Sequence, residues 1–187
     1  WTRRWTPAPL AIALPATVEE VQAVIRWSAG EGVAVVPSGG RTGLSGGAVA
    51  ANGELVLSLE RMNKALAYDA VDRTLVVQAG MPLEAVHNAA LDHGLIYPVD
   101  FAARGSCTIG GNIATNAGGI RVIRYGNTRE WIAGLKVVTA SGELLELNKG
   151  LIKNSSGYDF RQLLIGSEGT LGVIVEATVK LTDPPPA

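Results

Sequence analysis

The chain is organised around residues 105–119, which read Gly-Ser-Cys-Thr-Ile-Gly-Gly-Asn-Ile-Ala-Thr-Asn-Ala-Gly-Gly. Five of these fifteen residues are glycine, which loses the most backbone freedom on folding and is used where the backbone must approach a ligand closely. The side chains between the glycines are short and form hydrogen bonds: Ser106, Thr108, Asn112, Thr115 and Asn116. The stretch predicts a wall against a large polar cofactor, with a run of tight turns as the alternative.

Length and composition indicate a folded chain with ordinary surface charge. Its 187 residues fit one domain or two small lobes that share a ligand, and a hydrophobic content of 47% argues against disorder. A net charge of −1 without a basic run argues against nucleic-acid binding, and no apolar run approaches the roughly 18 residues of a membrane span. The lone Cys107 excludes a disulfide framework and favours a reducing, cytoplasmic compartment.

The first part of the sequence predicts a small parallel α/β lobe, assigned to about residues 1–66. A capping box of Thr17 and Glu20 opens a helix that we expect to end at Gly30. We expect strands at three short apolar runs: residues 10–14, 33–36 and 55–59. This strand–helix–strand order is typical of a parallel sheet.

A second glycine cluster follows the strand predicted at 33–36 and reads Pro37-Ser-Gly-Gly-Arg-Thr-Gly-Leu-Ser-Gly-Gly. Its backbone N–H groups can form an anion-binding nest at the carboxyl end of that strand, to which Arg41 and Thr42 would add a positive charge and a hydroxyl. The cluster has neither the Gly-Lys pair of a P-loop nor the G-x-G-x-x-G spacing that opens a helix. A glycine hairpin without a ligand is the alternative.

The remaining residues, about 67–187, predict a second lobe that is rich in strands. The expected elements are a strand at 74–79, a helix at 82–93, a hairpin of 135–140 with 143–147, and a short helix at 158–165. Residues 173–181 alternate apolar and polar side chains, which predicts an antiparallel strand at or near an edge, with one wet face. His87 and His93 are expected on a helix surface rather than as metal ligands. The predicted fold class is therefore α+β, with a small parallel α/β lobe and a mixed or antiparallel sheet lobe.

A third glycine cluster reads Gly166-Ser-Glu-Gly-Thr-Leu-Gly and completes a set of three. In order and spacing the set resembles the flavin-binding domain of FAD-linked oxidoreductases of the vanillyl-alcohol-oxidase type. With the Arg-Tyr-Gly word at 124–126, it is most similar to the D-2-hydroxyacid dehydrogenases, such as the D-2-hydroxyglutarate dehydrogenase and glycolate oxidase D-subunit groups. The resemblance covers nearly the whole chain and implies FAD as the cofactor.

The resemblance also implies which residues bind FAD. The first cluster would hold the diphosphate: Pro37, Gly39, Gly40, Arg41, Thr42, Gly43 and Leu44. The central stretch and two residues before it would line the flavin ring and the ribityl chain: Pro98, Asp100, Gly105, Ser106, Thr108, Gly110, Gly111, Asn112, Thr115, Asn116 and Gly118. The third cluster and the strand after it would close the adenosine end: Gly169, Gly172 and Ile174. Glu168 is either a buried structural acid, which is favoured, or a direct ligand.

Two departures from the family pattern bear on the chemistry. Relatives with covalent flavin carry His where this chain has Arg41, which implies non-covalent FAD and leaves Cys107 as the other candidate for a covalent bond. Family members also continue into a cap domain that supplies the base, the carboxylate-binding groups and often a metal site. The chain lacks an initiator Met and has a proline-rich end at 183–186, so we expect a piece of a longer protein, with neither catalytic residues nor a metal site of its own.

The expected function is the FAD-binding part of an enzyme that oxidises a D-2-hydroxy acid, held by the missing cap, to the 2-oxo acid. Two alternatives stay open. One is a catalytically silent flavin-binding subunit or electron relay, and the other is a flavoenzyme similar to the enolpyruvyl-sugar reductases. The sequence identifies neither the hydroxy acid nor the electron acceptor, and it is compatible with a homodimer.

Overall fold

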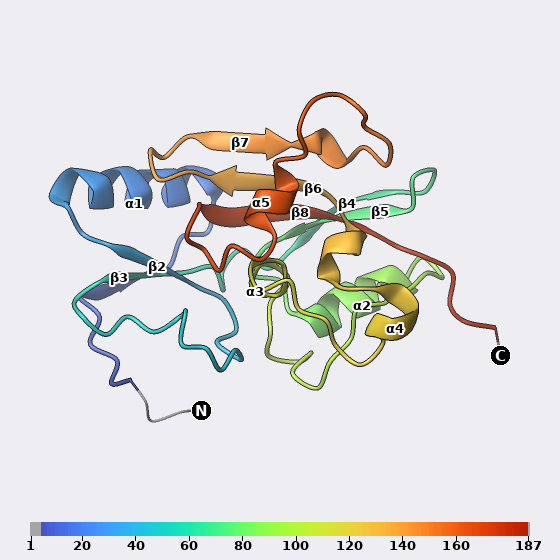
Figure 1. The fold of residues 1–187 in the computed structure, drawn as a ribbon, viewed down its shortest axis with the longest axis horizontal. Helices are drawn as coiled ribbons and strands as arrows, with labels where there is room; N and C mark the ends of the chain where they lie inside the picture. Colours follow the sequence, from blue (N-terminus) through green and yellow to red (C-terminus); the bar gives the residue numbers. More distant parts are fainter. Residues whose placement is uncertain (1–4, 187) are drawn as a thin grey trace.

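The computed structural model describes residues 5–186 and contains two β-sheets (Figure 1). The first sheet is parallel, with the strand order β1-β3-β2. Its strands are β1 (Ala11–Ala13), β2 (Val35–Ser38) and β3 (Leu55–Ser58). The helix α1 (Val18–Glu31) connects β1 to β2 and buries Val21 and Ile25 in a core shared with the second sheet. This is the small parallel lobe that the sequence predicts.

The capping box opens α1 as expected. The Thr17 side chain accepts a hydrogen bond from the Glu20 N–H (3.2 Å), and Glu20 Oε2 accepts one from the Ala16 N–H (2.6 Å). The two side chains therefore satisfy the N–H of Glu20 in the first turn and that of Ala16 just before the helix. The helix continues past Gly30, the predicted stop, because Gly32 with φ 67° takes the left-handed C-cap position.

The second sheet is antiparallel throughout, with the strand order β4-β5-β8-β6-β7. Its strands are β4 (Ala65–Asp69), β5 (Thr74–Gln78), β6 (Ile132–Val138), β7 (Leu144–Leu147) and β8 (Val173–Lys180). The predicted hairpin is formed by β6 and β7, whereas β4 was not predicted. The two sheets together confirm the α+β class.

The strand β8 is the centre of the second sheet, so the prediction of an edge or near-edge strand with one wet face is wrong. It lies between β5 and β6, and its first five residues are all buried. Its polar side chains find partners instead of water. Glu176 forms an ion pair with Lys136 of β6, and Lys180 Nζ lies 5.9 Å from the centre of the Trp131 ring. The alternation therefore separates an apolar face from a face of partnered polar groups.

The helices of the second half are α2 (Leu83–Leu91), α3 (Ile109–Ala114), α4 (Val122–Tyr125) and α5 (Arg161–Leu164), with short 3-10 turns η1 (Thr128–Trp131) and η2 (Asn148–Gly150). In Figure 1, α2, α3 and α4 lie on one side of the second sheet. Both α2 and α5 are shorter than predicted. Among residues 5–186, no helix combines the length and the apolar character that crossing a membrane requires.

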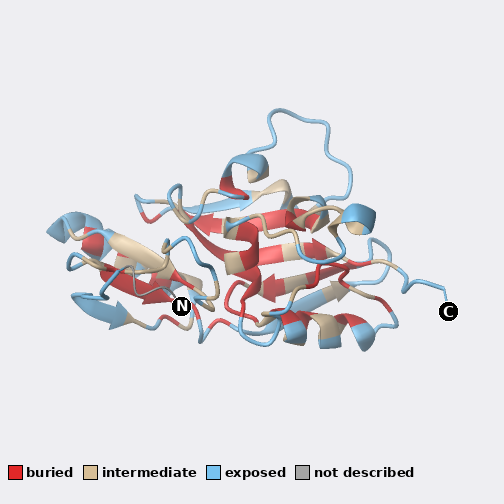
Figure 2. Cartoon of the chain, turned by 60° about the horizontal axis from the view of Figure 1, so that its bottom comes forward, coloured by how far each residue is buried: buried red, intermediate tan, exposed pale blue. Residues whose placement is uncertain are grey.

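The helix α3 was not predicted, because it is formed by the central glycine stretch itself. Ile109 and Ile113 are fully buried, and the helix contacts β8. The two isoleucines are four positions apart and therefore share one face of the helix. Figure 2 shows buried residues concentrated in the strands. Gly39, directly after β2, packs against Thr108 at the start of α3.

Candidate functional site

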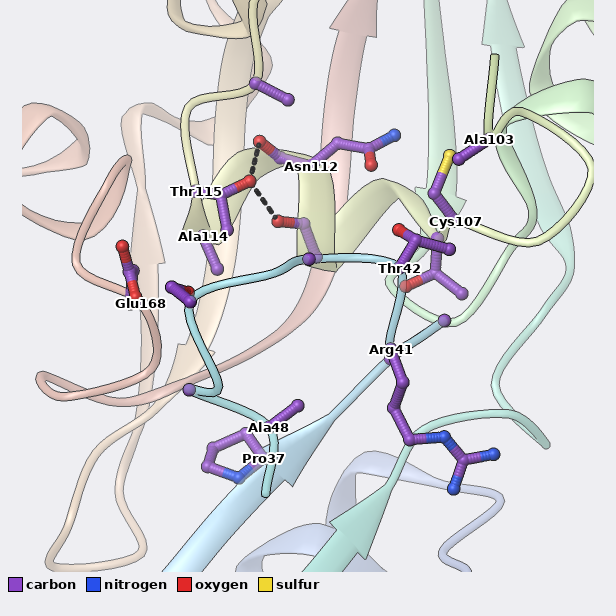
Figure 3. Close-up of a pocket in the computed structure, with 18 of the residues that line it drawn as sticks. Pro37, Arg41, Thr42, Ala48, Ala103, Cys107, Asn112, Ala114, Thr115 and Glu168 are labelled. Carbon is purple, nitrogen blue, oxygen red and sulfur yellow. Dashed lines mark hydrogen bonds between the residues drawn. The ribbon is translucent and has the colours of Figure 1, made fainter. Parts of the chain in front are cut away.

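A cavity of about 360 Å³ opens between the loop after β2 and the stretch that contains α3 (Figure 3). Pockets for small molecules span roughly 300–1,000 Å³. One wall consists of Pro37 and residues 39–43 and 45–49. The other wall consists of Phe101, Ala103, Cys107, Thr108, Gly111, Asn112, Ala114, Thr115 and Ala117, and Glu168 lies at the rim. Residues from all three glycine clusters therefore meet at one cavity.

Glycine lets the two walls touch beside this cavity. A Cβ on Gly39 would overlap Thr108 Oγ1, and a Cβ on Gly40 would overlap the carbonyl oxygen of Ser106. Neither glycine has a positive φ, so the close approach of the walls, and not an unusual backbone conformation, requires the missing side chain. Ser106 thus supports the loop through its backbone, although it does not line the cavity.

The loop after β2 keeps its backbone donors free. Within the described part of the chain, no oxygen accepts a hydrogen bond from the N–H groups of residues 40–47. Successive free N–H groups make an anion-binding concavity. Arg41 has φ 53° and an exposed side chain, and Figure 3 shows its guanidinium directed away from Asn112 and Thr115. The loop therefore offers its backbone to an anion in the cavity.

The opposite wall carries two buried polar atoms, Thr108 Oγ1 and Asn112 Nδ2, with no hydrogen-bond partner among residues 5–186. Thr108 is 8% exposed and Asn112 is 4% exposed. Asn112 lies next to the Cys107 thiol, which is too weak an acceptor to satisfy an amide. Because an unsatisfied buried group costs about 1–3 kcal/mol, both atoms favour a ligand that brings polar groups into the cavity.

Cys107 lines the same cavity and is buried. Burial raises the pKa of its thiol, so the protonated form predominates at neutral pH. The thiolate is the nucleophilic form of cysteine. The environment of Cys107 therefore disfavours a covalent bond to a cofactor.

The third glycine cluster docks on the end of α3. The Gly166 N–H donates to the carbonyl of Ile113 (3.0 Å), and the Glu168 N–H donates to that of Ala114 (2.8 Å). Glu168 has φ 52° and an exposed side chain, so its interpretation as a buried structural acid is wrong. Figure 3 shows its carboxylate at the rim of the cavity, where the backbone bond to Ala114 positions it.

A second cavity of about 260 Å³ is lined by Gly169 and Gly172 and shares Pro37 with the first. A ligand longer than one cavity could extend past Pro37 from one to the other. Ile174 lines neither cavity, because it is buried within β8 opposite Val137. The prediction placed Ile174 at the adenosine end, whereas the structure places it in the core.

Several other predicted residues also lie outside the first cavity: Leu44, Pro98, Asp100, Gly105, Ser106, Gly110, Asn116 and Gly118. Gly110 packs on Ala79, which directly follows β5, and an added Cβ would lie 2.7 Å from Ala79 Cβ. Asn116 Oδ1 accepts a hydrogen bond from the Arg129 N–H (3.0 Å) and so fixes a turn. Thr115 does line the cavity, but its hydroxyl donates to a carbonyl of α3 (3.0 Å). Gly110, the Asn116 oxygen and the Thr115 hydroxyl thus make contacts within the protein that shape this stretch.

The sequence reasoning missed the apolar side chains on the wall that contains α3, namely Phe101, Ala103, Ala114 and Ala117. These side chains form no hydrogen bonds, so a search for polar groups around glycine does not detect them. Their position directly before and inside the glycine-dense stretch is the signal that could have found them.

Comparison with known proteins identifies the family. A family model described as "FAD binding domain" matches residues 9–148. A D-2-hydroxyglutarate dehydrogenase from Xanthomonas citri pv. viticola is 83% identical over 186 residues, covering 100% of this chain and 39% of the relative. A mitochondrial protein of the same name from Bos taurus is 44% identical, covering 100% of this chain and 34% of the relative. A solved alkyldihydroxyacetonephosphate synthase matches with a TM-score of 0.82 and 29% identity over 94% of this chain and 34% of its own.

The chain spans about 40% of the length of the bacterial relatives it matches, the second of which is from Stutzerimonas stutzeri at 60% identity. The matched residues, 9–148, contain both walls of the cavity. Fold, cavity and sequence thus agree, and the chain belongs to the family of FAD binding domains.

Proposed function

We propose that this chain holds FAD non-covalently and serves as the cofactor-binding part of an enzyme that oxidises D-2-hydroxyglutarate, or a similar D-2-hydroxy acid, to the 2-oxo acid. One observation carries the proposal. The loop at 40–47, whose N–H groups have no acceptor among the described residues, lies across the cavity from a wall with two buried, unpartnered polar atoms, Thr108 Oγ1 and Asn112 Nδ2. The names of the relatives, which are D-2-hydroxyglutarate dehydrogenases, support the choice of substrate.

The residues present fit an elongated dinucleotide. The loop at 40–47 suits a diphosphate, because its N–H groups are donors that no oxygen of residues 5–186 uses. Thr108 and Asn112 would hydrogen-bond to the polar groups of the flavin half. The second cavity, with Gly169 and Gly172, would hold the adenosine end. We therefore propose that the predicted residues that line the two cavities bind FAD, with the diphosphate at the loop and the adenosine in the second cavity.

When bound, FAD supplies the hydride acceptor of the reaction. The residues of this chain bind and orient it and keep water from it. Phe101, Ala103, Ala114 and Ala117 give the α3 wall an apolar character, which strengthens the remaining hydrogen bonds by lowering the local dielectric constant. The raised pKa of Cys107 supports a non-covalent cofactor, since the protonated thiol is a poor nucleophile.

The base for the hydroxyl proton is proposed to come from the rest of the full-length protein. Of the two histidines, His87 Nε2 lies 2.8 Å from the Val99 carbonyl oxygen, and the His93 ring stacks on Tyr68 at 3.6 Å. Among the described residues, the only carboxylate that lines the cavity is that of Glu168, at the rim. The lack of a candidate base other than Glu168 among the described residues that line the cavity also favours a second candidate function. In that function the chain is a flavin-binding module that relays electrons and does not oxidise a substrate itself.

A denaturation experiment tests the cofactor proposal. Precipitating the holoprotein with acid should release FAD into the supernatant, with one FAD per chain. Flavin that stays with the precipitate would contradict non-covalent binding, and FMN or no flavin would contradict the cofactor assignment. For the substrate, D- and L-2-hydroxyglutarate, D-lactate and D-malate are mixed anaerobically with the full-length protein. Bleaching of the flavin by the L isomer alone, or by none of these acids, would contradict the proposed reaction.

A cytoplasmic location and a homodimer complete the proposal. The two bacterial relatives favour the first, although the relative from Bos taurus is named as mitochondrial. Fractionation of the source cells tests the location, and analytical ultracentrifugation of the holoprotein tests the dimer.

A further inference from the structure

The two ends of the glycine stretch are fastened at one buried residue, Asp100, which is 5% exposed. Its Oδ2 lies 3.5 Å from Arg104 Nη1 and 3.4 Å from Arg121 Nη2. Its backbone carbonyl accepts a hydrogen bond from the Ile120 N–H (3.0 Å). We call this group of four residues the Asp100 clasp. It joins the segment before residues 105–119 to the segment after them.

A glycine makes the backbone part of the clasp possible. Gly119 has φ 85°, which side chains rarely allow, and a Cβ there would overlap the carbonyl oxygen of Asp100. The chain therefore passes Asp100 in direct contact before it reaches Arg121. The last glycine of the stretch is used for this contact and not for a ligand.

The clasp lies outside the cavity but encloses one of its walls. Asp100 and both arginines line a separate surface groove. Between Asp100 and Arg121 in sequence lie several residues that line the cavity, namely Phe101, Ala103, Gly111, Asn112, Ala114 and Ala117. Closing this loop at its two ends sets the distance between the segment at 101–103 and the segment at 114–117.

We propose that Asp100 is a positioning residue whose ion pairs with Arg104 and Arg121 hold this wall at the spacing that FAD requires. The inference rests on the proposed binding of FAD in the cavity. The arginine side chains are about half exposed, at 52% and 45%, while that of Asp100 is 8% exposed. Salt therefore reaches the cations, and high ionic strength should weaken the clasp.

The test compares variants that keep or remove the charge. Asp100→Asn keeps the backbone contacts and loses both ion pairs, and Arg121→Gln loses one. We expect the Kd for FAD to rise about 3- to 5-fold in Arg121→Gln, the worth of one partly exposed ion pair, and about tenfold in Asp100→Asn, which loses two. Arg121→Lys retains the charge and should recover most of the affinity. In about 1 M salt, where the Debye length falls to roughly 3 Å, the difference from wild type should shrink.

A matched control breaks an ion pair elsewhere. Arg73 Nη1 lies 2.7 Å from Asp183 Oδ2, at the surface and outside the glycine stretch, so Arg73→Gln should leave the Kd for FAD unchanged. Urea unfolding of the apoproteins separates positioning from stability, because Arg121→Gln should bind FAD weakly while unfolding at the wild-type midpoint. If Asp100→Asn does not fold, the comparison of Arg121→Gln with Arg121→Lys still tests the inference.

Wild-type affinity in both Asp100→Asn and Arg121→Gln would overturn the inference, as would an equal loss in Arg73→Gln. These outcomes leave the proposed function intact, because the wild-type protein still binds FAD. A wild-type protein that binds no FAD would instead contradict the proposed function itself.

Discussion

Gly110 and Gly111 are neighbours on α3, and alanine should affect a different property at each position. A Cβ on Gly110 would lie 2.7 Å from Ala79 Cβ and 2.9 Å from the Ala79 carbonyl oxygen. Within the described chain, a Cβ on Gly111 would meet only Thr108 Oγ1, at 3.4 Å, and Gly111 lines the cavity. We therefore expect Gly110→Ala to weaken the fold and Gly111→Ala to weaken cofactor binding.

The magnitudes follow from the two environments. Alanine stabilises a helix over glycine by about 0.5–1 kcal/mol, so the apoprotein of Gly111→Ala should be at least as stable as wild type. Its methyl group takes space from the ligand, and overpacking costs about 1–3 kcal/mol, which corresponds to a rise of roughly 5- to 150-fold in the Kd for FAD. Gly110→Ala presses on Ala79, directly after β5, and should lower the free energy of unfolding by about 1–3 kcal/mol.

Two measurements on each variant give the answer. Urea unfolding of the apoprotein, followed by tryptophan fluorescence, reports stability, and titration with FAD, followed by quenching of flavin fluorescence, reports affinity. A Gly111→Ala protein with the wild-type Kd would refute the placement of the cofactor against α3. A Gly110→Ala protein of wild-type stability would refute the packing of α3 on Ala79.

Four further predictions concern other parts of the molecule. Thr108→Val removes a buried hydroxyl without a partner, so apoprotein stability should hold while the Kd for FAD rises about 3- to 10-fold, the worth of one hydrogen bond, in the same titration. Burial raises the pKa of the Cys107 thiol. The protonated thiol therefore stabilises the fold fully at any pH below the ordinary thiol pKa, and this stabilisation is lost as the pH rises through the raised pKa of the folded state. The free energy of unfolding of wild type, measured in urea, should therefore fall more steeply above about pH 9 than that of Cys107→Ala. Lys136→Met leaves the buried carboxylate of Glu176 unpaired and should cost about 3 kcal/mol in urea unfolding, whereas unchanged stability would mean that the pair contributes nothing. The FAD-loaded chain alone should be reduced by dithionite but not by D-2-hydroxyglutarate in anaerobic stopped-flow, and reduction at about 1 s⁻¹ or faster would place the base within these residues.

Sequence reasoning pointed to the glycine-rich walls of this cavity because its signals are local. Glycine density at 37–47 and 105–119 marks places where backbone must approach backbone or ligand, and most of the residues in both walls of the cavity come from these segments. The capping box at Thr17 likewise predicted the start of α1, since a helix start depends on neighbouring residues.

The predictions that failed depend on contacts between distant residues. The alternation in β8 does not reveal that Lys136 of β6 pairs with Glu176, so a central strand resembled an edge strand. Ile174 follows the third glycine cluster directly, but the pairing of β8 with β6 takes it into the core. Asp100 precedes the central stretch, yet the arginines at 104 and 121 draw its carboxylate away from the cavity. In each case the partner is fixed only by the tertiary fold.

Hydrogen exchange with and without FAD tests the central claim most directly. The N–H groups of residues 40–47 have no acceptor in the described chain, so they should exchange rapidly in the apoprotein, since exchange is slowed by hydrogen bonding. A bound diphosphate would accept hydrogen bonds from several of them. We predict that FAD slows exchange in the peptide covering residues 40–47, while the peptide covering β4 is unchanged. Protection that appears elsewhere and leaves residues 40–47 exchanging at the apoprotein rate would contradict the placement of FAD in this cavity.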